Sequence, residues 1–423
     1  MNFIFPDRVA LTRDPLGFLL SRTNHALAPL TPLALGFHRV HLISDLALIN
    51  DRSFDSGTLC VSDFSSAVFT PITIDDCWDG HQIAQNTTET RSIDCTRVIN
   101  DMTHNILINS RKSIFSAYQH ASFDCWRFSS ILATKLTFAA LFGSKSMDAF
   151  DQRAFTIHAE RIYSSRDLIA LDFICERERE RLKREQLCKQ SLQKVGSMIR
   201  TAFKHRQPQS VCDYMYKTES ETFRSFKEIY QLVLAVHQAT AEAFFWVIFA
   251  LARAKFMRAV IENEADACLL SNGDLGLNKL YLAKSTKNIS LEIIRLVPIH
   301  NIIVYIVKSC ARLVPYGIRS GDKIVICPHV IFRSGRYFPN ADSLIVGRAY
   351  DVNLLKLQYL ASGGGAVFHI VLLNLMLFLL DLAAAFELEV VEGPREFTAL
   401  PSLQAARPDV KVRLNLRRSR LFR

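Results

Sequence analysis

A glutamate and two arginines in apolar surroundings constrain this chain more than any other feature of its sequence. Glu292 and Arg295 lie three residues apart in the segment Leu291-Glu-Ile-Ile-Arg-Leu296, so in a helix they share one face. A carboxylate buried among leucine and isoleucine needs partners, and the planar guanidinium of arginine can donate two hydrogen bonds to it. Arg348, at the end of the later segment Phe338-Pro-Asn-Ala-Asp-Ser-Leu-Ile-Val-Gly-Arg348, is a third candidate. We therefore expect Glu292, Arg295 and Arg348 to form one buried cluster.

The order of these segments resembles the K-helix and meander of the cytochrome P-450 family, the haem-thiolate monooxygenases. Ile318-Arg-Ser-Gly-Asp322, and Thr240 with Phe245-Trp246, resemble motifs of its sterol-hydroxylase and prostacyclin-synthase branch. The resemblance implies the P-450 fold, which is mainly α with a small β portion. We expect a single domain over residues 1–405 and a basic strand or tail over residues 406–423. Residues 225–255 should form one long central helix that resembles the family's I-helix.

The resemblance also implies a chemistry. It implies a haem cofactor, a lipophilic small molecule as the substrate of a monooxygenase, and an NADPH-dependent reductase as the electron donor. The hydroxyl of Thr240 would then bond bound oxygen and help to deliver protons. The alternative for Thr240 is a hydrogen bond to a carbonyl of its own helix. Ala239 and Glu242 stand where the branch has a polar residue and a proline, which weakens the proton-delivery interpretation.

The thiolate that such a family requires is missing. The last cysteine of the chain is Cys327, well before the segment from Tyr359 to Val371, which resembles the glycine-rich approach to the haem ligand. Its three consecutive glycines, Gly363, Gly364 and Gly365, would let the backbone come close to a flat cofactor. After the K-helix the family often has an arginine near a haem propionate; the segment Asn301 to Lys308 has no arginine, and Lys308 is the one basic residue there that could substitute.

Two registers of the glycine-rich segment are open. The family pattern is Phe-x-x-Gly-x-x-x-Cys-x-Gly, and counting from Gly365 puts His369 in the place of the cysteine. Counting back from Phe386 makes residues 374–386 the L-helix, with the cysteine simply absent. In the first register His369 would ligate iron, as histidine does in globins and peroxidases; in the second it is a buried helix residue. The alternative to a monooxygenase is therefore an inactive paralogue, or a truncated or mispredicted gene product, that binds haem weakly or not at all.

Charge and composition limit partners and compartment. The net charge is +10, and much of the excess lies in Lys411–Arg423, where no aromatic residues alternate with the basic ones to stack on bases. This argues against nucleic acid and suits an acidic electron donor or a peripheral membrane contact. The ten cysteines show no CxxC pair, which indicates reduced thiols in an intracellular protein, cytoplasmic or associated with the endoplasmic reticulum. Charged residues within the first 20 positions indicate that this chain has no N-terminal membrane anchor.

Two apolar runs and one charged run have simpler interpretations. The runs 232–254 and 366–386 contain interior polar residues, which favours buried core helices over membrane spans. The run Glu176-Arg-Glu-Arg-Glu-Arg-Leu-Lys-Arg-Glu185 alternates in sign and is typical of a solvated helix with ion pairs along its surface.

Overall fold

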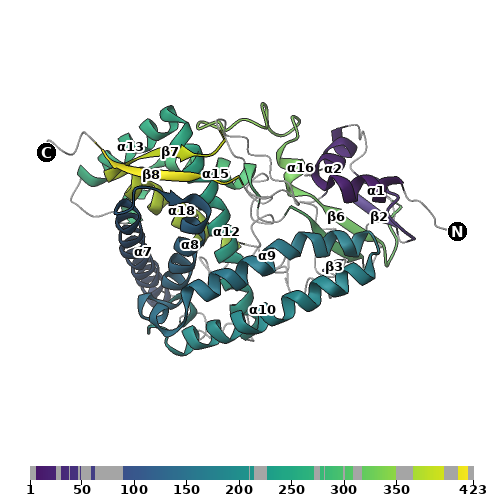
Figure 1. Ribbon diagram of the computed structural model, residues 1–423, viewed down its shortest axis with the longest axis horizontal. Helices are drawn as coiled ribbons and strands as arrows, with labels where there is room; N and C mark the ends of the chain where they lie inside the picture. The colour runs from purple at the N-terminus through teal and green to yellow at the C-terminus, as the bar shows by residue number, and fades with distance from the viewer. Residues whose placement is uncertain are drawn as a thin grey trace.

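The protein is mainly helical with two small sheets, as predicted (Figure 1). The structure is a computed structural model. It describes residues 6–24, 30–37, 39–45, 48, 59–61, 89–208, 210–213, 226–270, 277–280, 282–298, 301–307, 317–348, 365–394 and 408–417. Gly363, Gly364 and Lys308 lie outside the described residues.

The helices account for most of the described chain. They are α1 (Pro6–Arg13), α2 (Pro15–Asn24), α7 (Glu89–Tyr118), α8 (Cys125–Phe142), α9 (Gln152–Ile174), α10 (Glu178–Lys204), α12 (Phe226–Arg253), α13 (Lys255–Leu270), α14 (Leu277–Leu280), α15 (Lys284–Leu296), α16 (Pro328–Phe332) and α18 (Gly365–Ala385). The strands are β1 (Leu30–Leu33), β2 (Val40–Ile43), β3 (Leu59–Val61), β4 (Phe123–Asp124), β5 (Ile303–Val307), β6 (Lys323–Ile326), β7 (Phe386–Glu392) and β8 (Lys411–Leu416).

Helix α12 is the central element of the main core. It packs chiefly against α8 and α18, and its apolar residues belong to the largest cluster of buried side chains. The predicted long helix over residues 225–255 thus corresponds to α12. Among the described residues, two helices are long and apolar enough to cross a membrane, Ile229–Arg253 and Val367–Ala385, and each has 89% of its most apolar window buried inside the protein. This burial agrees with the prediction of core helices for the two apolar runs.

The larger sheet has the strand order β1-β2-β6-β5-β3 and lies at the opposite end of the molecule from α13 (Figure 1). Strands β2 and β6 are parallel, and the other described pairs are antiparallel. Separate apolar clusters contain residues from these strands: one includes Ile43, Ile324 and Ile326, the other Val40, Leu42 and Val325. The alternation places neighbouring residues of a strand on opposite faces, as a two-sided sheet requires.

The smaller sheet has the order β4-β8-β7 and includes the C-terminal strand. The segment 406–423, expected to be a basic strand or tail, supplies β8, whose Val412 and Leu414 are buried in the main core. Just after β8, Arg417 donates to both carboxylate oxygens of Asp266 on α13, at 2.9 and 2.7 Å. A basic residue that follows this strand therefore anchors it to the helical core.

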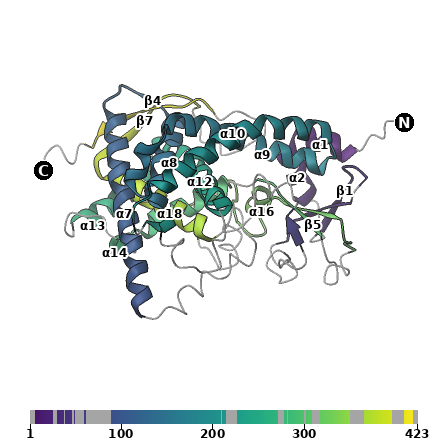
Figure 2. The ribbon, with the colours of Figure 1, turned by 90° about the horizontal axis from the view of Figure 1, so that it is seen from below.

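Helices α9 and α10 form a long antiparallel hairpin that connects the two ends of the molecule (Figure 2). At one end its residues join the main core, and at the other Ile174 and Cys175 join the cluster beside the larger sheet. Arg181 donates to Glu178 and to Glu185 on the outer surface of α10. The alternating charged run is therefore a helix with surface ion pairs over most of its length, as predicted.

Candidate functional site

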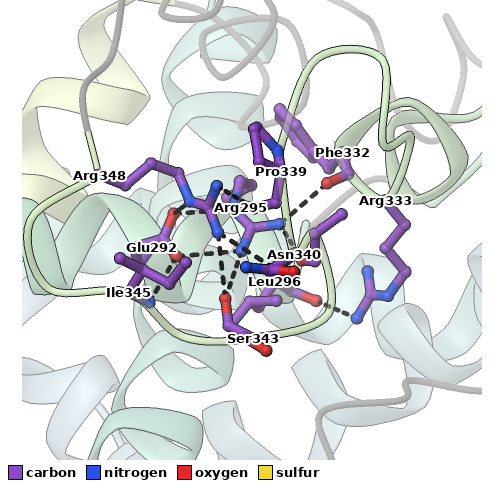
Figure 3. Close-up of polar contacts among 11 residues, drawn as sticks. Glu292, Arg295, Leu296, Phe332, Arg333, Pro339, Asn340, Ser343, Ile345 and Arg348 are labelled. Carbon is purple, nitrogen blue, oxygen red and sulfur yellow. Dashed lines mark hydrogen bonds and ion pairs between the residues drawn. The ribbon is translucent and has the colours of Figure 1, made fainter.

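Glu292 lies at the centre of a buried cluster on α15 (Figure 3). Its side chain is fully buried. One carboxylate oxygen, Oε1, accepts from Arg295 Nε at 2.8 Å and is 3.0 Å from Arg348 Nε. The other, Oε2, accepts from Arg295 Nη2 and from the backbone N–H of Ile345, both at 3.0 Å. A buried carboxylate is thus surrounded by donors, which offset the cost of placing it in an apolar core.

Arg295 uses every donor of its guanidinium. Besides the two bonds to Glu292, its Nη1 donates to the carbonyls of Phe332 at 2.9 Å and Ala341 at 2.6 Å. Its Nη2 also donates to the carbonyl of Ser343 at 3.1 Å. Guanidinium has five N–H groups in a rigid fork, so all five are satisfied. Arg295 therefore ties α15 to three points of the chain between residues 332 and 343.

Arg348 fixes the far end of the same loop. Its Nη1 donates to the carbonyl of Pro339 at 2.8 Å, and its Nη2 lies within bonding distance of the carbonyls of Asn340 and Ser343. The ring of Phe338 lies 5.0 Å from the Arg295 guanidinium carbon and 5.7 Å from that of Arg348. The structure thus brings together all three residues singled out from the sequence, and the loop 338–348 is held in one conformation on α15.

Another buried arginine extends this cluster and was not identified from the sequence. Arg333 donates to the carbonyl of Leu296 at the end of α15, at 2.9 Å, and contacts Nδ1 of His329 at 3.1 Å. Burial lowers the pKa of Arg333 to about 10, and burial followed by the charge of Arg333 lowers the pKa of His329 well below its usual value. The sequence feature that could have identified Arg333 is its position as a charged residue at the end of the apolar run Val330-Ile-Phe-Arg333.

Thr240 is fully buried on α12 and faces α18. The side-chain amide of Asn374 donates to its hydroxyl at 3.4 Å, and the rings of Phe244 and Phe378 pack at 4.7 Å one turn further on. The described contact of Thr240 is therefore a link between two core helices. Its predicted role in proton delivery stays a prediction, and the sequence did not point to Asn374.

His237 forms a buried polar node between three helices that the sequence did not predict. Its Nε2 is 2.9 Å from the hydroxyl of Thr134 on α8, and its Nδ1 is 2.8 Å from the hydroxyl of Tyr163 on α9. Tyr163 also donates to the carbonyl of Leu234 at 3.1 Å. Which ring nitrogen donates depends on the tautomer, because the single hydroxyl protons of Tyr163 and Thr134 also have the carbonyls of Leu234 and Ser130 as acceptors. Burial lowers the pKa of His237 to about 4.

This node predicts a pH dependence of stability. In the unfolded chain a histidine has a pKa near 6.5, so between pH 6.5 and 4 the unfolded state binds more protons at position 237 than the folded state. Stability contributed by His237 is complete above pH 6.5 and falls by about 3 kcal/mol as the pH drops to 4. Urea titrations at pH 7 and at pH 4 measure this. Between these two pH values, the free energy of unfolding should fall by about 3 kcal/mol less in His237→Gln than in the parent chain. Parallel pH profiles for the two proteins would contradict this.

The cysteines whose side chains the structure describes are poor candidates for a thiolate ligand. Six of the ten cysteines have side chains that the structure describes, and all six are buried: Cys125, Cys175, Cys188, Cys212, Cys268 and Cys327. Burial raises the pKa of Cys125 and of Cys212, which disfavours the thiolate that binds iron. Gly365 is the first residue of α18, so residues 365–371 of the expected glycine-rich segment are helical, and His369 lies inside a regular helix.

His369 is an exposed residue on α18, whereas its neighbours Phe368 and Ile370 are buried. Partial burial of its imidazole and then the charge of Lys287 on α15 lower the pKa of His369. Its place in a helix agrees with the register in which residues 374–386 are the L-helix, but the expectation that His369 is buried in that register was wrong.

The fold is that of the cytochromes P450. The chain is similar to a crystal structure of a cytochrome P450, CYP102L1, with a TM-score of 0.65 and 16% sequence identity. The similarity covers 97% of this chain and 96% of that chain. No protein-family model and no curated protein matches the sequence. The predicted P-450 fold is therefore confirmed by structure over nearly the whole chain.

Proposed function

We propose that this chain is a P-450-fold protein that has lost the thiolate-ligated haem and with it the monooxygenase reaction. One observation carries the proposal: every cysteine precedes residue 328, whereas the glycine-rich segment leads directly into α18 at Gly365. A thiolate supplies the electron density that favours O–O cleavage in this family, and neither histidine nor glycine can replace it in that role. What remains is the scaffold, with the cluster of Glu292, Arg295 and Arg348 complete.

His369 is not expected to take over as the iron ligand. His369 lies in the second turn of α18, so its backbone is held by the helix and the direction of its side chain is set by the helix geometry. Buried Phe368 and Ile370 flank it, whereas His369 itself is an exposed residue. This interpretation favours the register without a ligand over the register that puts His369 in the cysteine's place.

A second candidate function is the family's own reaction. The P450 fold over the whole chain favours it, and by resemblance it would mean a bound haem, a lipophilic small-molecule substrate and an NADPH-dependent reductase. Haem would supply oxygen activation when bound. If this chain carried out that reaction, the thiolate ligand of the haem would have to come from a segment other than the one that leads into α18.

A haem titration tests the assignment at His369. We expect His369→Ala to give the same ferric absorption spectrum and the same haem dissociation constant as the parent chain, because the imidazole does not reach the iron. His104→Ala, which removes an exposed histidine from α7, is the matched control. A change of spectrum in His369→Ala that is not seen in His104→Ala would show that His369 ligates haem.

A further inference from the structure

Helices α7 and α8 pack side by side along a seam that contains polar side chains (Figures 1 and 2). On α7, Asn105, Asn109 and Ser113 follow one another at helical spacing, so they share one face. Asn109 donates to the hydroxyl of Ser144, just after α8, at 3.0 Å, and this hydroxyl donates to Asn105 at 2.8 Å. The polar side chains of α7 in this seam are therefore uncharged.

Lys135 on α8 brings a positive charge into the same seam. It is half-buried, whereas every other residue from Leu132 to Phe142 is buried. Its Nζ donates to the hydroxyl of Ser113 at 3.4 Å, and that hydroxyl donates its own proton to the carbonyl of Asn109 at 2.8 Å. An ammonium group has three N–H donors, so this one long hydrogen bond leaves the others for water or a ligand.

Lys112 places a second positive charge beside the first. It is exposed on α7 next to Ser113. Burial and then the charge of Lys112 lower the pKa of Lys135, so the two ammonium groups are close enough to interact. Among the residues that the structure describes, no carboxylate forms an ion pair with either lysine, whereas the neighbouring Arg111 contacts Asp381 on α18 at 2.8 Å. The lysine pair therefore lacks a counter-charge from the protein.

A compact anion with more than one negative charge suits this pair. Lysine binds phosphate as a point charge, and its hydrogen bonds to phosphate oxygens are strengthened by charge. A phosphate monoester carries about −1.5 to −2 charges at pH 7 and three acceptor oxygens, so one phosphate group can accept from two ammonium groups at once. It would also offset the repulsion between the two lysines, which a neutral ligand would not.

We propose that Lys112 and Lys135 form a binding site for a phosphate group, either the free ion or the phosphate of a small monoester. Ser113 is a positioning residue that holds the ammonium group of Lys135 through the hydrogen bond between them. The site uses no residue of the cluster on α15 and none of the glycine-rich segment before α18. The proposal therefore does not depend on whether haem binds.

Thermal unfolding of the full chain tests this proposal. The probes are inorganic phosphate and glycerol 3-phosphate, with sodium chloride at the same ionic strength as the reference. A ligand that binds only the folded state raises the melting temperature as its concentration increases. Both probes should stabilise the parent chain. Lys112→Gln and Lys135→Gln should each weaken the apparent affinity at least about tenfold, because each removes a hydrogen bond between charged groups.

Two controls separate phosphate binding from other effects. Lys189→Gln removes an exposed lysine from α10 and should bind phosphate like the parent chain. Without phosphate, Lys135→Gln should melt at the parent's temperature or above it, because it removes a half-buried charge that lies near Lys112. Circular dichroism checks that the helix content of each variant is unchanged. If Lys135→Gln does not fold, Lys112→Gln, at an exposed position, still decides the question.

The remaining results are equally decisive. Stabilisation by inorganic phosphate alone would support the free ion as the ligand. Stabilisation by neither probe, or equal stabilisation by sodium chloride, would overturn the proposal, the second because salt would only be screening the net charge of +10. An equal loss of affinity in Lys189→Gln, or an unchanged affinity in Lys112→Gln, would also overturn it.

Discussion

Replacing Glu292 with alanine is expected to leave the protein largely insoluble or unfolded. The substitution removes a fully buried carboxylate and leaves Arg295, also fully buried, without its counter-charge. Breaking one partner of a buried pair costs about 3–5 kcal/mol, and a folded protein has only about 5–15 kcal/mol of stability in total. Arg348 and the backbone N–H of Ile345 would lose the same acceptor, so the loop on α15 would also loosen.

The chain provides its own control for this substitution. Glu178 and Arg181 form a pair with the same spacing on α10, but the Glu178 side chain is 64% exposed. Glu178→Ala should change the free energy of unfolding by less than about 1 kcal/mol, as is usual for surface pairs. Soluble yield and denaturant titrations measure both. A soluble Glu292→Ala protein with an unchanged melting temperature would contradict the structural role of the cluster.

A milder variant keeps the test decisive if Glu292→Ala cannot be purified. Arg348→Lys retains the positive charge beside Glu292 but loses the planar fork that reaches Pro339 and Asn340. We expect it to fold and to lose about 1.5–3 kcal/mol, the range for a hydrogen bond that involves a charged group. An unchanged denaturation midpoint would show that the loop does not need the fork.

The cluster on α15 could be predicted because its signal is local. Glu292 and Arg295 lie one turn apart in an apolar helix, and each charge demands a partner whatever the rest of the fold does. The family resemblance supplied Arg348 and the whole architecture. The resemblance also supplied the long central helix, whereas the buried nature of both long apolar runs followed from their interior polar residues.

Contacts between distant elements could not be predicted in this way. The partners of His237 lie on α8 and α9, and the partner of Thr240 lies on α18, so no spacing in the sequence relates them. The two registers around His369 were equally compatible with the sequence. The start of α18 at Gly365 favours the register in which residues 374–386 are the L-helix. The sequence alone could not place this start, because helix length depends on packing against α12, α13 and α7 as well as on local preference.

The central claim is that this scaffold carries no thiolate for haem. A thiolate from elsewhere would need to reach the segment that leads into α18. The six cysteines whose side chains the structure describes are buried, and five of them, Cys125, Cys175, Cys188, Cys212 and Cys268, have a raised pKa chiefly because of burial. Moving any of these side chains out of a packed core would leave a cavity, which costs stability.

The most direct measurement is the absorption spectrum of the purified full chain with added haem, reduced, with and without carbon monoxide. We expect the carbon-monoxide complex to lack the red-shifted band from which the P-450 family takes its name, whether haem binds loosely or not at all. Appearance of that band would contradict the claim, because it would mean that one of the chain's ten cysteines reaches the iron as a thiolate.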